Sequence, residues 1–519
     1  MACWRDAVEI GGRSYLYRRV LEVAVLIYIV TCATVPTSYA QNGFLSLDCG
    51  GAQANYIDSS HSLQWVSDDD YISTGNSSKQ SDYPSDLPAL GSFRYFPGDR
   101  SKYCYALPTP NLTYLVRASF YMDRSELTAR RPFKFIFSVD ATDWFTVTSG
   151  DGTSQSLLVV QEGIFTPPYY VTNFCLRPVS GVPFISSLEL RLMDQTFDYY
   201  TTMYAYTGSG SQYLALGIRY NCGAKNISDV RYPQDPFDRI WKTPDASFDT
   251  EFASIHSTKP TPNTTIDQNF VPREVMQDAW LFPDNSSGTL SIAPIFTTGP
   301  QAYVTLSEYA FSLLYFEDLN TATSGTNQIN IYVDQNFFIS WNTSSQPTLF
   351  GNPYNILGRN GLDISLLLGD ASTSPVKDLA SLNAVEVYGQ LTYNFSITNT
   401  DDGDFISAMQ TGFSLTDWQG DPCVPVPYNE LSCQFSGATY GLSQGYANQR
   451  TIFVNNFNIN SLDISDIKNS NFSSIVGNST ILPNFRLHGL DTMSITNSGV
   501  DDQIFLFLIN YTSTVLTTL

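Results

Sequence analysis

The sequence predicts a mainly β protein with two tandem β-sandwich domains between Gln41 and Ile397, and three observations carry this prediction. Short runs rich in β-branched and aromatic residues recur through this region and are separated by Gly, Pro, Asn, Asp and Ser. Amphipathic helical stretches are scarce. Two similar stretches, FLSLDCGG (Phe44–Gly51) and LGIRYNCGA (Leu216–Ala224), indicate an internal duplication.

The strand pattern is clearest in four runs that alternate apolar and polar residues or are apolar throughout. They are KFIFSVD (Lys134–Asp140), SLLVVQ (Ser156–Gln161), INIYVD (Ile329–Asp334) and VEVYGQL (Val385–Leu391). Short strands with turn-rich connections favour antiparallel sheets that bury one face against another sheet. The duplication places the domains at residues 41–205 and 206–397, with GSGS (Gly208–Ser211) as a flexible connection.

Composition limits the possible partners. The chain has 519 residues, too many for one core, with 43% hydrophobic and 15% charged residues, which is typical of globular domains. Its net charge of −22 repels phosphate backbones, so we expect no nucleic-acid partner.

Residues 1–40 are predicted to be a signal peptide. Four arginines precede the apolar run Val23–Ala33, and Ser38–Ala40 reads as a cleavage site. An uncleaved anchor is the alternative, because Glu22 borders an apolar run that is short for a membrane span. Later stretches are too polar for a span, so the sequence predicts that the mature chain carries none. We therefore expect a secreted or plasma-membrane-associated protein on the extracellular side.

Cysteines and glycosylation motifs agree with export. An even number of mature cysteines in an exported chain predicts disulfides. Cys423 and Cys433 are close enough to close a local, proline-rich loop, and we expect them to pair. The first sandwich is expected to be held by disulfides among four cysteines, whose pairing the sequence leaves open: Cys49, Cys104, Cys175 and Cys222. Zinc binding by these cysteines is the alternative. N-glycosylation sequons occur at Asn76, Asn111, Asn226, Asn263, Asn285, Asn342, Asn394, Asn471, Asn478 and Asn510.

The strand-like residue pattern ends after Ile397. Residues 398–440 are predicted to be a linker with a cap bounded by Cys423 and Cys433. Residues 441–519 are predicted to be an incomplete leucine-rich-repeat-like region, because LDTMSITNSGV (Leu490–Val500) fits the repeat template. INSLDI (Ile459–Ile464) and LTTL (Leu516–Leu519) are weaker candidates for neighbouring repeats.

Seven stretches in order resemble the malectin-like ectodomain of plant leucine-rich-repeat receptor-like kinases. They are FLSLDCGG, SFRYFPGDRSKYCYALP (Ser92–Pro108), YLVRASFYM (Tyr114–Met122), PFISSLELR (Pro183–Arg191), YPQDPFDRIW (Tyr232–Trp241), LNAVEVYGQL (Leu382–Leu391) and WQGDPCVPVPY (Trp418–Tyr428). The resemblance implies two malectin-like sandwiches, a Cys-bounded cap and leucine-rich repeats, then a membrane span and a kinase. Asp417–Cys433 is then the junction between sandwiches and repeats.

The chain departs from the family in several places. NELSC (Asn429–Cys433) lacks the family's tryptophan, the repeats are degenerate, and no span or kinase follows. We therefore expect either a truncated product or a secreted receptor-like protein. We also expect the sugar cradle of animal malectin, a related domain, to be lost, because this chain has Arg124-Ser125 and Asn320-Thr321 where a Tyr-Phe pair is usual.

The resemblance implies binding without catalysis, and the ligand is a cell-wall glycan or an extracellular peptide or protein. Sugar sites set aromatic faces against the ligand. Loop aromatics are therefore the candidate ligand-binding residues: Tyr71, Trp144, Tyr169, Tyr170, Tyr199 and Tyr200. A soluble co-receptor or decoy that acts by protein contacts is the alternative function.

An enzyme is the least favoured function. The three histidines, His61, His256 and His488, have no catalytic or metal-ligand spacing, so we expect no catalytic residues, metal or cofactor. A glycoside hydrolase needs only paired acids. Asp68-Asp69-Asp70, Glu317-Asp318 and Asp401-Asp402-Asp404 supply such acids, although adjacent acids are usually solvated loop charges. Weak calcium binding by these acids is a further alternative, without an EF-hand loop.

Overall fold

The computed structural model describes part of the 519-residue chain. The described residues are 41–52, 55–110, 112–150, 155–193, 212–225, 229–244, 253–256, 271–282, 288–292, 302–304, 309–316, 328–333, 336–342, 348–355, 362–368, 380–392, 396–400, 402–403, 406–407, 410, 418–435, 456–463 and 492–494. The predicted signal peptide, the GSGS connection and most sequons lie outside them. Asn76 is exposed on a described strand, as a glycosylation site requires.

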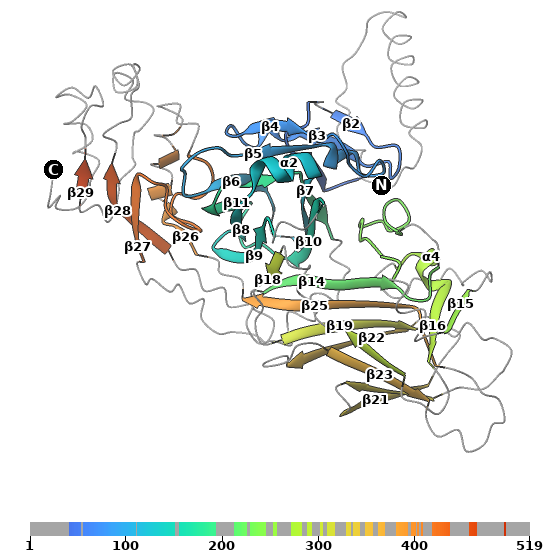
Figure 1. Ribbon diagram of the computed structural model, residues 1–519. Coiled ribbons are helices and arrows are strands. Elements are labelled where there is room, and N and C mark those ends of the chain that lie inside the picture. The colour runs from blue at the N-terminus through green and yellow to red at the C-terminus, as the bar shows by residue number, and fades with distance from the viewer. Residues whose placement is uncertain are drawn as a thin grey trace, which may run out of the picture. The chain divides into compact units, whose positions relative to one another are not determined.

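A ten-stranded sheet is the largest element (Figure 1). Its order is β2-β3-β1-β13-β7-β10-β14-β25-β19-β22, and every neighbouring pair is antiparallel except β1 and β3. In that order the strands are Asn55–Ile57, Gln64–Ser67, Phe44–Asp48, Ser187–Leu192, Tyr114–Met122, Leu157–Phe165, Gln212–Asn221, Ala384–Thr392, Tyr309–Phe316 and Thr348–Asn355.

Five smaller sheets and four short helices complete the described fold. One sheet has β18 (Ala302–Val304), β9 (Thr142–Thr148), β8 (Lys134–Val139), β11 (Val171–Ser180) and β6 (Tyr103–Pro108). Two others are β12 (Phe184–Ile185), β5 (Ser92–Tyr95) and β4 (Asn76–Lys79), and β15 (Ala253–His256), β16 (Asp278–Phe282) and β24 (Ala380–Leu382). A fourth has β17 (Gly288–Ile292), β23 (Leu362–Leu368), β20 (Gln328–Val333) and β21 (Asn336–Asn342). The last has β26 (Ile397–Thr398), β28 (Asn456–Asp463), β27 (Leu431–Phe435) and β29 (Thr492–Ser494). The helices are η1 (Asp68–Asp70), η2 (Pro88–Gly91), α2 (Arg124–Arg130) and α4 (Arg273–Met276).

The strand order of the first half is repeated in the second. In the ten-stranded sheet, β1-β13-β7-β10 is followed by β14-β25-β19-β22, and each strand has its counterpart in chain order. The same correspondence relates β6-β11-β8-β9 to β17-β23-β20-β21, and β12-β5-β4 to β24-β16-β15. This repetition supports the duplication predicted from the sequence.

Alternating side chains build the first core. All nine residues of β7 are buried, because both faces of this strand are covered. One face carries Val116, Ala118 and Phe120 into an aromatic core, where Phe120 packs edge-on against Phe137 of β8 at 5.6 Å. The opposite face carries Arg117, which lies in the candidate site described below. The period of two therefore separates an apolar core from a buried polar layer.

The two Cys-Gly steps have the same backbone role. Gly50 follows β1 with φ +75°, and Gly223 follows β14 with φ +80°. A Cβ on Gly50 would lie 2.5 Å from the carbonyl oxygen of Phe93, and one on Gly223 would lie 2.3 Å from that of Ala279. Both positions therefore need glycine for its conformation and for its small size.

The structure corrects one part of the predicted cysteine framework. Cys104 and Cys175 form a disulfide between the register partners of β6 and β11, but Cys49 and Cys222 are free, buried thiols. Cys49 directly follows β1 and Cys222 directly follows β14, and burial raises the pKa of each thiol well above its usual value. The predicted disulfide of Cys423 with Cys433 is confirmed.

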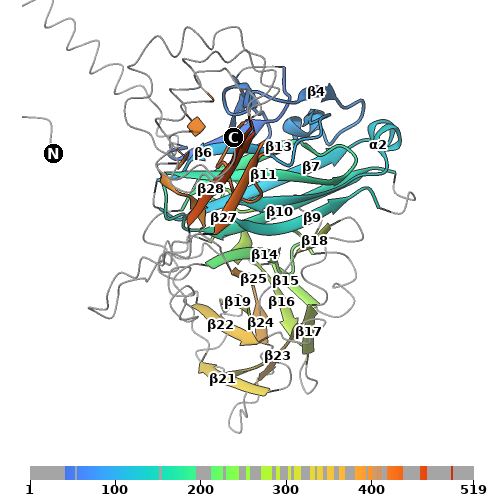
Figure 2. The ribbon, with the colours of Figure 1, turned by 90° about the vertical axis from the view of Figure 1, so that its left-hand side faces the viewer.

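The segment closed by Cys423 and Cys433 lies against the beginning of β6. Lys102 is buried there and donates from Nζ to the carbonyl oxygens of Asp421 and Val424, and its ammonium lies 4.5 Å from the ring centroid of Tyr428. Figure 2 shows β27, which begins at the end of this segment, beside β28, its antiparallel partner. The segment thus connects the first half to the last sheet.

The last sheet contains two parallel strands from the predicted repeat region. β28 pairs with β29 through Ser461 and Thr492, Leu462 and Met493, and Asp463 and Ser494. Parallel pairing of successive strands is the arrangement expected within a leucine-rich solenoid. The repeat region itself stays a prediction. Among the described residues, no helix is both long and apolar enough to span a bilayer.

We expect alanine at Gly50 or Gly223 to destabilise the fold. Each substitution forces a side chain into a positive φ and against a backbone carbonyl, which costs about 1–3 kcal/mol. The free energy of unfolding from urea denaturation measures this loss. Gly403→Ala is the matched control, because a Cβ there would have no neighbour within 4 Å in the described part of the chain. Equal stability of all three variants would contradict the backbone role.

Lys102 predicts a pH dependence of stability. Burial lowers the pKa of its ammonium to about 7, although Asp421 opposes the shift. The unfolded chain keeps this proton to about pH 10.4, so the folded protein binds fewer protons between pH 7 and 10 and gains stability as pH rises. Relative to Lys102→Met, the free energy of unfolding should rise by up to about 1.4 kcal/mol per pH unit. Urea denaturation at pH 7, 8 and 9 measures it, and a constant difference would show that Lys102 stays charged.

Candidate functional site

The face of the ten-stranded sheet opposite the aromatic core carries a buried ion network. Arg117 on β7 lies opposite Glu162 of β10 and Glu189 of β13 in the strand register. Its Nη2 lies 2.8 Å from Glu162 Oε2 and its Nη1 2.9 Å from Glu189 Oε2. The network continues into the second half, where Arg219 of β14 binds both Glu162 and Glu386 of β25. These cross-strand pairs link the two halves of the sheet.

The segment 229–243 covers this polar face. Its Asp238 is fully buried and accepts hydrogen bonds from Arg117, Arg191 and Arg231, at 3.1, 2.9 and 2.8 Å. Burial alone would raise the pKa of Asp238, but the three guanidinium groups hold it well below its usual range. A single carboxylate therefore neutralises arginines from two strands and from the covering segment.

The same segment has a second buried pair. Asp235 accepts hydrogen bonds from Arg239 Nε at 2.8 Å and from Trp241 Nε1 at 2.7 Å. Trp241 is fully buried against the apolar side chains around Val275 and Tyr388. Ion pairs and aromatic packing together fix the segment on the sheet.

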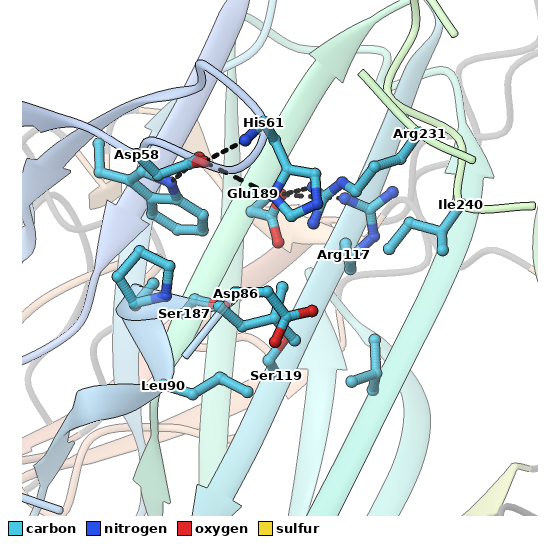
Figure 3. A pocket seen from close by; sticks show the side chains of 15 residues that line it. Asp58, His61, Asp86, Leu90, Arg117, Ser119, Ser187, Glu189, Arg231 and Ile240 are labelled. Atoms are coloured by element: carbon cyan, nitrogen blue, oxygen red, sulfur yellow. Dashed lines mark hydrogen bonds and ion pairs between the residues drawn. The ribbon is translucent and has the colours of Figure 1, made fainter. Parts of the chain in front are cut away.

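A pocket of about 50 Å³ remains between the sheet, the covering segment, the β2–β3 hairpin and η2 (Figure 3). Its floor is polar and contains Arg117, Ser119, Ser187 and Glu189 from β7 and β13. Its walls are largely apolar and include Leu87, Pro88, Leu90, Val160 and Ile240.

Asp58 and His61 line the pocket from the turn of the β2–β3 hairpin. Asp58 accepts hydrogen bonds from the backbone N–H of His61, at 2.5 Å, and from Trp65 Nε1, at 3.2 Å. Burial raises the pKa of Asp58, but the hydrogen bonds from His61 and Trp65 outweigh this and lower it overall. Asp58 is therefore a charged anchor of the hairpin, and His61 Nδ1 lies 3.5 Å from it.

The predicted ligand-binding aromatics do not come together at this pocket. Trp144 is a correction: it lies within β9 and is fully buried in the aromatic core, because its position alternates inward, so it cannot form a surface platform. Tyr71 is half-buried against the same core. Tyr169 is half-buried, with its pKa raised to about 12 by burial, whereas Tyr170 is 78% exposed. Tyr199 and Tyr200 lie outside the described residues.

The first acidic run also differs from expectation. Asp68 is fully buried and accepts hydrogen bonds from Arg94, Tyr105 and the backbone of Gly50. Its carboxylate is therefore structural and cannot reach a sugar. Asp69 and Asp70 are exposed, as expected of loop charges, and Asp402 is buried. Glu317, Asp318, Asp401 and Asp404 lie outside the described residues.

Sequence reasoning missed the pocket and its ion network. Their residues come from strands and a segment that are far apart in the chain. A signal was present, because RAS in Tyr114–Met122 and LELR in Pro183–Arg191 place charges at alternate positions of otherwise apolar strands. Within the described part of the chain, no three His, Cys, Asp or Glu side chains are arranged to hold a metal ion.

Comparisons with known proteins give a consistent family. The family model of the malectin-like domain matches residues 47–390. A probable LRR receptor-like serine/threonine-protein kinase of Arabidopsis thaliana is 29% identical over 431 residues, which cover 78% of this chain and 43% of that protein. The nodulation receptor kinase of Pisum sativum is 28% identical over 451 residues, covering 81% of this chain and 43% of that protein. The chain thus spans under half the length of these relatives.

Solved structures agree in fold. The structure of the plant peptide RALF23 in complex with FER and LLG2 matches with a TM-score of 0.51 at 17% identity, over 67% of this chain and 95% of that chain. The ANXUR2 extracellular domain from Arabidopsis thaliana matches with a TM-score of 0.51 at 16% identity, over 67% of this chain and 97% of that chain. At such identities the likeness is one of fold alone.

We expect Asp238→Asn to destabilise the protein by about 3–5 kcal/mol, because it leaves three buried guanidinium groups without their common carboxylate. The folded-state pKa of Asp238 is lowered, so its contribution is present above the usual pKa of aspartate and is lost as pH falls through the folded value. Urea denaturation at pH 7 measures the change. Asp70→Asn, an exposed control, should stay within about 0.5 kcal/mol of the parent. Similar losses in both variants would contradict the special role of Asp238.

Proposed function

Since this chain belongs to the malectin-like domain family, we propose that it is the extracellular, ligand-binding region of a plant receptor-kinase-type protein. The observation that carries the proposal is the match of kinase relatives to 78% and more of this chain, within less than half of their own length. Such a region binds a ligand and performs no chemistry itself. The predicted signal peptide, the sequons and the two disulfides support an extracellular location.

We favour an extracellular peptide or protein as the ligand. The pocket of about 50 Å³ holds roughly three to five water-sized groups. A single side chain of a partner protein fits a pocket of this size. A structural neighbour, FER, has been solved with a peptide and a second protein. That complex supports the same class of partner for this chain.

The proposed organisation is two malectin-like sandwiches followed by leucine-rich repeats. The repeated strand order supports the two sandwiches, and the parallel pairing of β28 with β29 supports the repeats. The segment held by Cys423 and Cys433 bonds to the first half through Lys102 and leads into β27. A ligand contact on the sandwiches can therefore act on the repeats through a stiff connection.

Two other functions remain in view. A soluble co-receptor or decoy would use the same binding surface and differ only in lacking a kinase, so it shares the experiments below. A glycoside hydrolase needs two carboxylates that reach the substrate. The carboxylate of Asp68 cannot reach a substrate, because it is buried and accepts hydrogen bonds from Arg94 and Tyr105. This acid therefore gives the hydrolase no support.

We expect the full chain, secreted from insect cells, to bind an extracellular plant peptide or protein saturably and to release no reducing sugar from β-glucan, pectin or xylan. Biolayer interferometry against a panel of secreted plant peptides and proteins measures binding, and a reducing-sugar assay measures catalysis. A glycan array is screened in parallel.

Each result decides between the functions. Sugar release that disappears when one acid is changed would establish a hydrolase. Saturable binding to one saccharide class, lost in Tyr170→Ala, would favour a lectin-like receptor, because Tyr170 is the exposed aromatic among the described candidates. No binding by folded protein in either screen would overturn the ligand-binding proposal.

A further inference from the structure

The pocket on the polar face contains hydrogen-bonding atoms that the described part of the chain does not satisfy. Arg231 uses Nε and Nη2 to bind Asp238, and within the described residues its Nη1 has no partner. Glu189 Oε2 accepts hydrogen bonds from Arg117 and Arg191, and Glu189 Oε1 has no partner within the described residues. Both side chains are more than nine-tenths buried, at 6% and 4% side-chain exposure. An unmet donor and an unmet acceptor thus line one small cavity.

Two serines add to this floor. The hydroxyl groups of Ser119 and Ser187 have no hydrogen-bond partner among the described residues, and both residues are buried and line the pocket (Figure 3). A hydroxyl both donates and accepts a hydrogen bond. The floor thus offers donors and acceptors to a ligand group or to water that supplies both kinds of partner.

The charges around the pocket exclude an ionised ligand group. A cation on the floor would meet the guanidinium groups of Arg117 and Arg231, whereas an anion would meet the carboxylates of Glu189, Asp58 and Asp86, which also line the pocket. Removing an ionised group from water is unfavourable unless a free opposite charge compensates it. Asp58 and Arg117 are already engaged by hydrogen bonds within the protein. A neutral group that donates and accepts avoids this cost.

The volume of the pocket and its apolar walls further limit which neutral group can bind. The volume of about 50 Å³ accommodates roughly three to five water-sized groups. The side chains of asparagine and glutamine have about four or five non-hydrogen atoms and end in a neutral group with one acceptor and two donors. The apolar walls from Leu90, Val160 and Ile240 suit the methylene part of such a side chain. A carboxamide therefore matches the pocket in size, charge and hydrogen bonding.

We propose that this pocket binds the carboxamide side chain of an asparagine or glutamine presented by the extracellular peptide or protein partner. The proposal rests on the proposed function and specifies its ligand chemistry. The carbonyl oxygen accepts from Arg231 Nη1 and a serine hydroxyl, and the amide nitrogen donates to Glu189 Oε1. The methylene part of the partner's anchor residue packs against Val160.

The test selects peptides on the full secreted chain. A yeast-displayed library of random peptides is enriched for binders, and fluorescence polarisation gives the Kd of the best peptide. We expect one Asn or Gln position to be enriched. Changing that residue to Glu, Lys or Leu should weaken binding at least about tenfold, because each replacement leaves donors or acceptors unpaired or buries a charge.

Matched protein variants locate the site. Val160→Phe fills the pocket and should weaken binding at least about tenfold. Leu158→Phe is its control, because Leu158 is exposed on the same face of β10 and does not line the pocket. Ser187→Ala removes a hydroxyl and should reduce the preference for the carboxamide over its Leu replacement by about threefold. Urea denaturation of each variant verifies that it folds.

The outcomes separate this inference from the proposed function. Tight peptides that bind Val160→Phe as well as the parent would show that the pocket holds only water, while the receptor proposal stands. An anchor position that prefers Lys or Glu would overturn the carboxamide chemistry. If folded protein enriches no peptide and also binds nothing in the screens of extracellular proteins and glycans, both proposals fail.

Discussion

The convergence of three arginines on Asp238 is the constraint on which the rest of the described structure depends. Buried guanidinium groups are tolerated only when carboxylates neutralise them and their hydrogen bonds are met. Arg117 and Arg191 come from strands of the sheet, and Arg231 comes from the covering segment. The carboxylate of Asp238 therefore holds the covering segment on the sheet. The covering segment must therefore stay in place for the polar face to remain buried.

The same network determines how the strands align. A slip of one residue in β7 would turn Arg117 into the aromatic core and Val116 into the polar layer, and both changes are costly. Arg219 extends the network across β14, so ion pairs as well as backbone hydrogen bonds connect the repeated strand sets. Such buried pairs add little net stability, because the cost of removing the charges from water offsets their attraction.

The proposed binding surface follows from this arrangement. The network leaves Arg231 and Glu189 each with one polar atom that the described residues do not satisfy, at the floor of a small cavity with apolar walls. A structural role uses most of their hydrogen-bonding capacity, and the remaining capacity lines the pocket in which we propose that a partner binds. In this proposal the same side chains serve structure and recognition, so the ligand contact is best tested at Ser187 or Val160, away from the ion pairs.

The sequence by itself determined the β class, the repeated Cys-Gly steps, the disulfide of Cys423 with Cys433 and the malectin-like family, because these depend on local patterns and on short separations along the chain. Only the tertiary structure decided that Trp144 is core, that Asp68 is buried with Arg94, that Cys49 and Cys222 stay unpaired, and that a pocket forms at all. Strand alternation shows which residues share a face, but not which face is covered or by what. That depends on the segment 229–243, which lies more than 100 residues along the chain from Arg117 and reaches it only through folding.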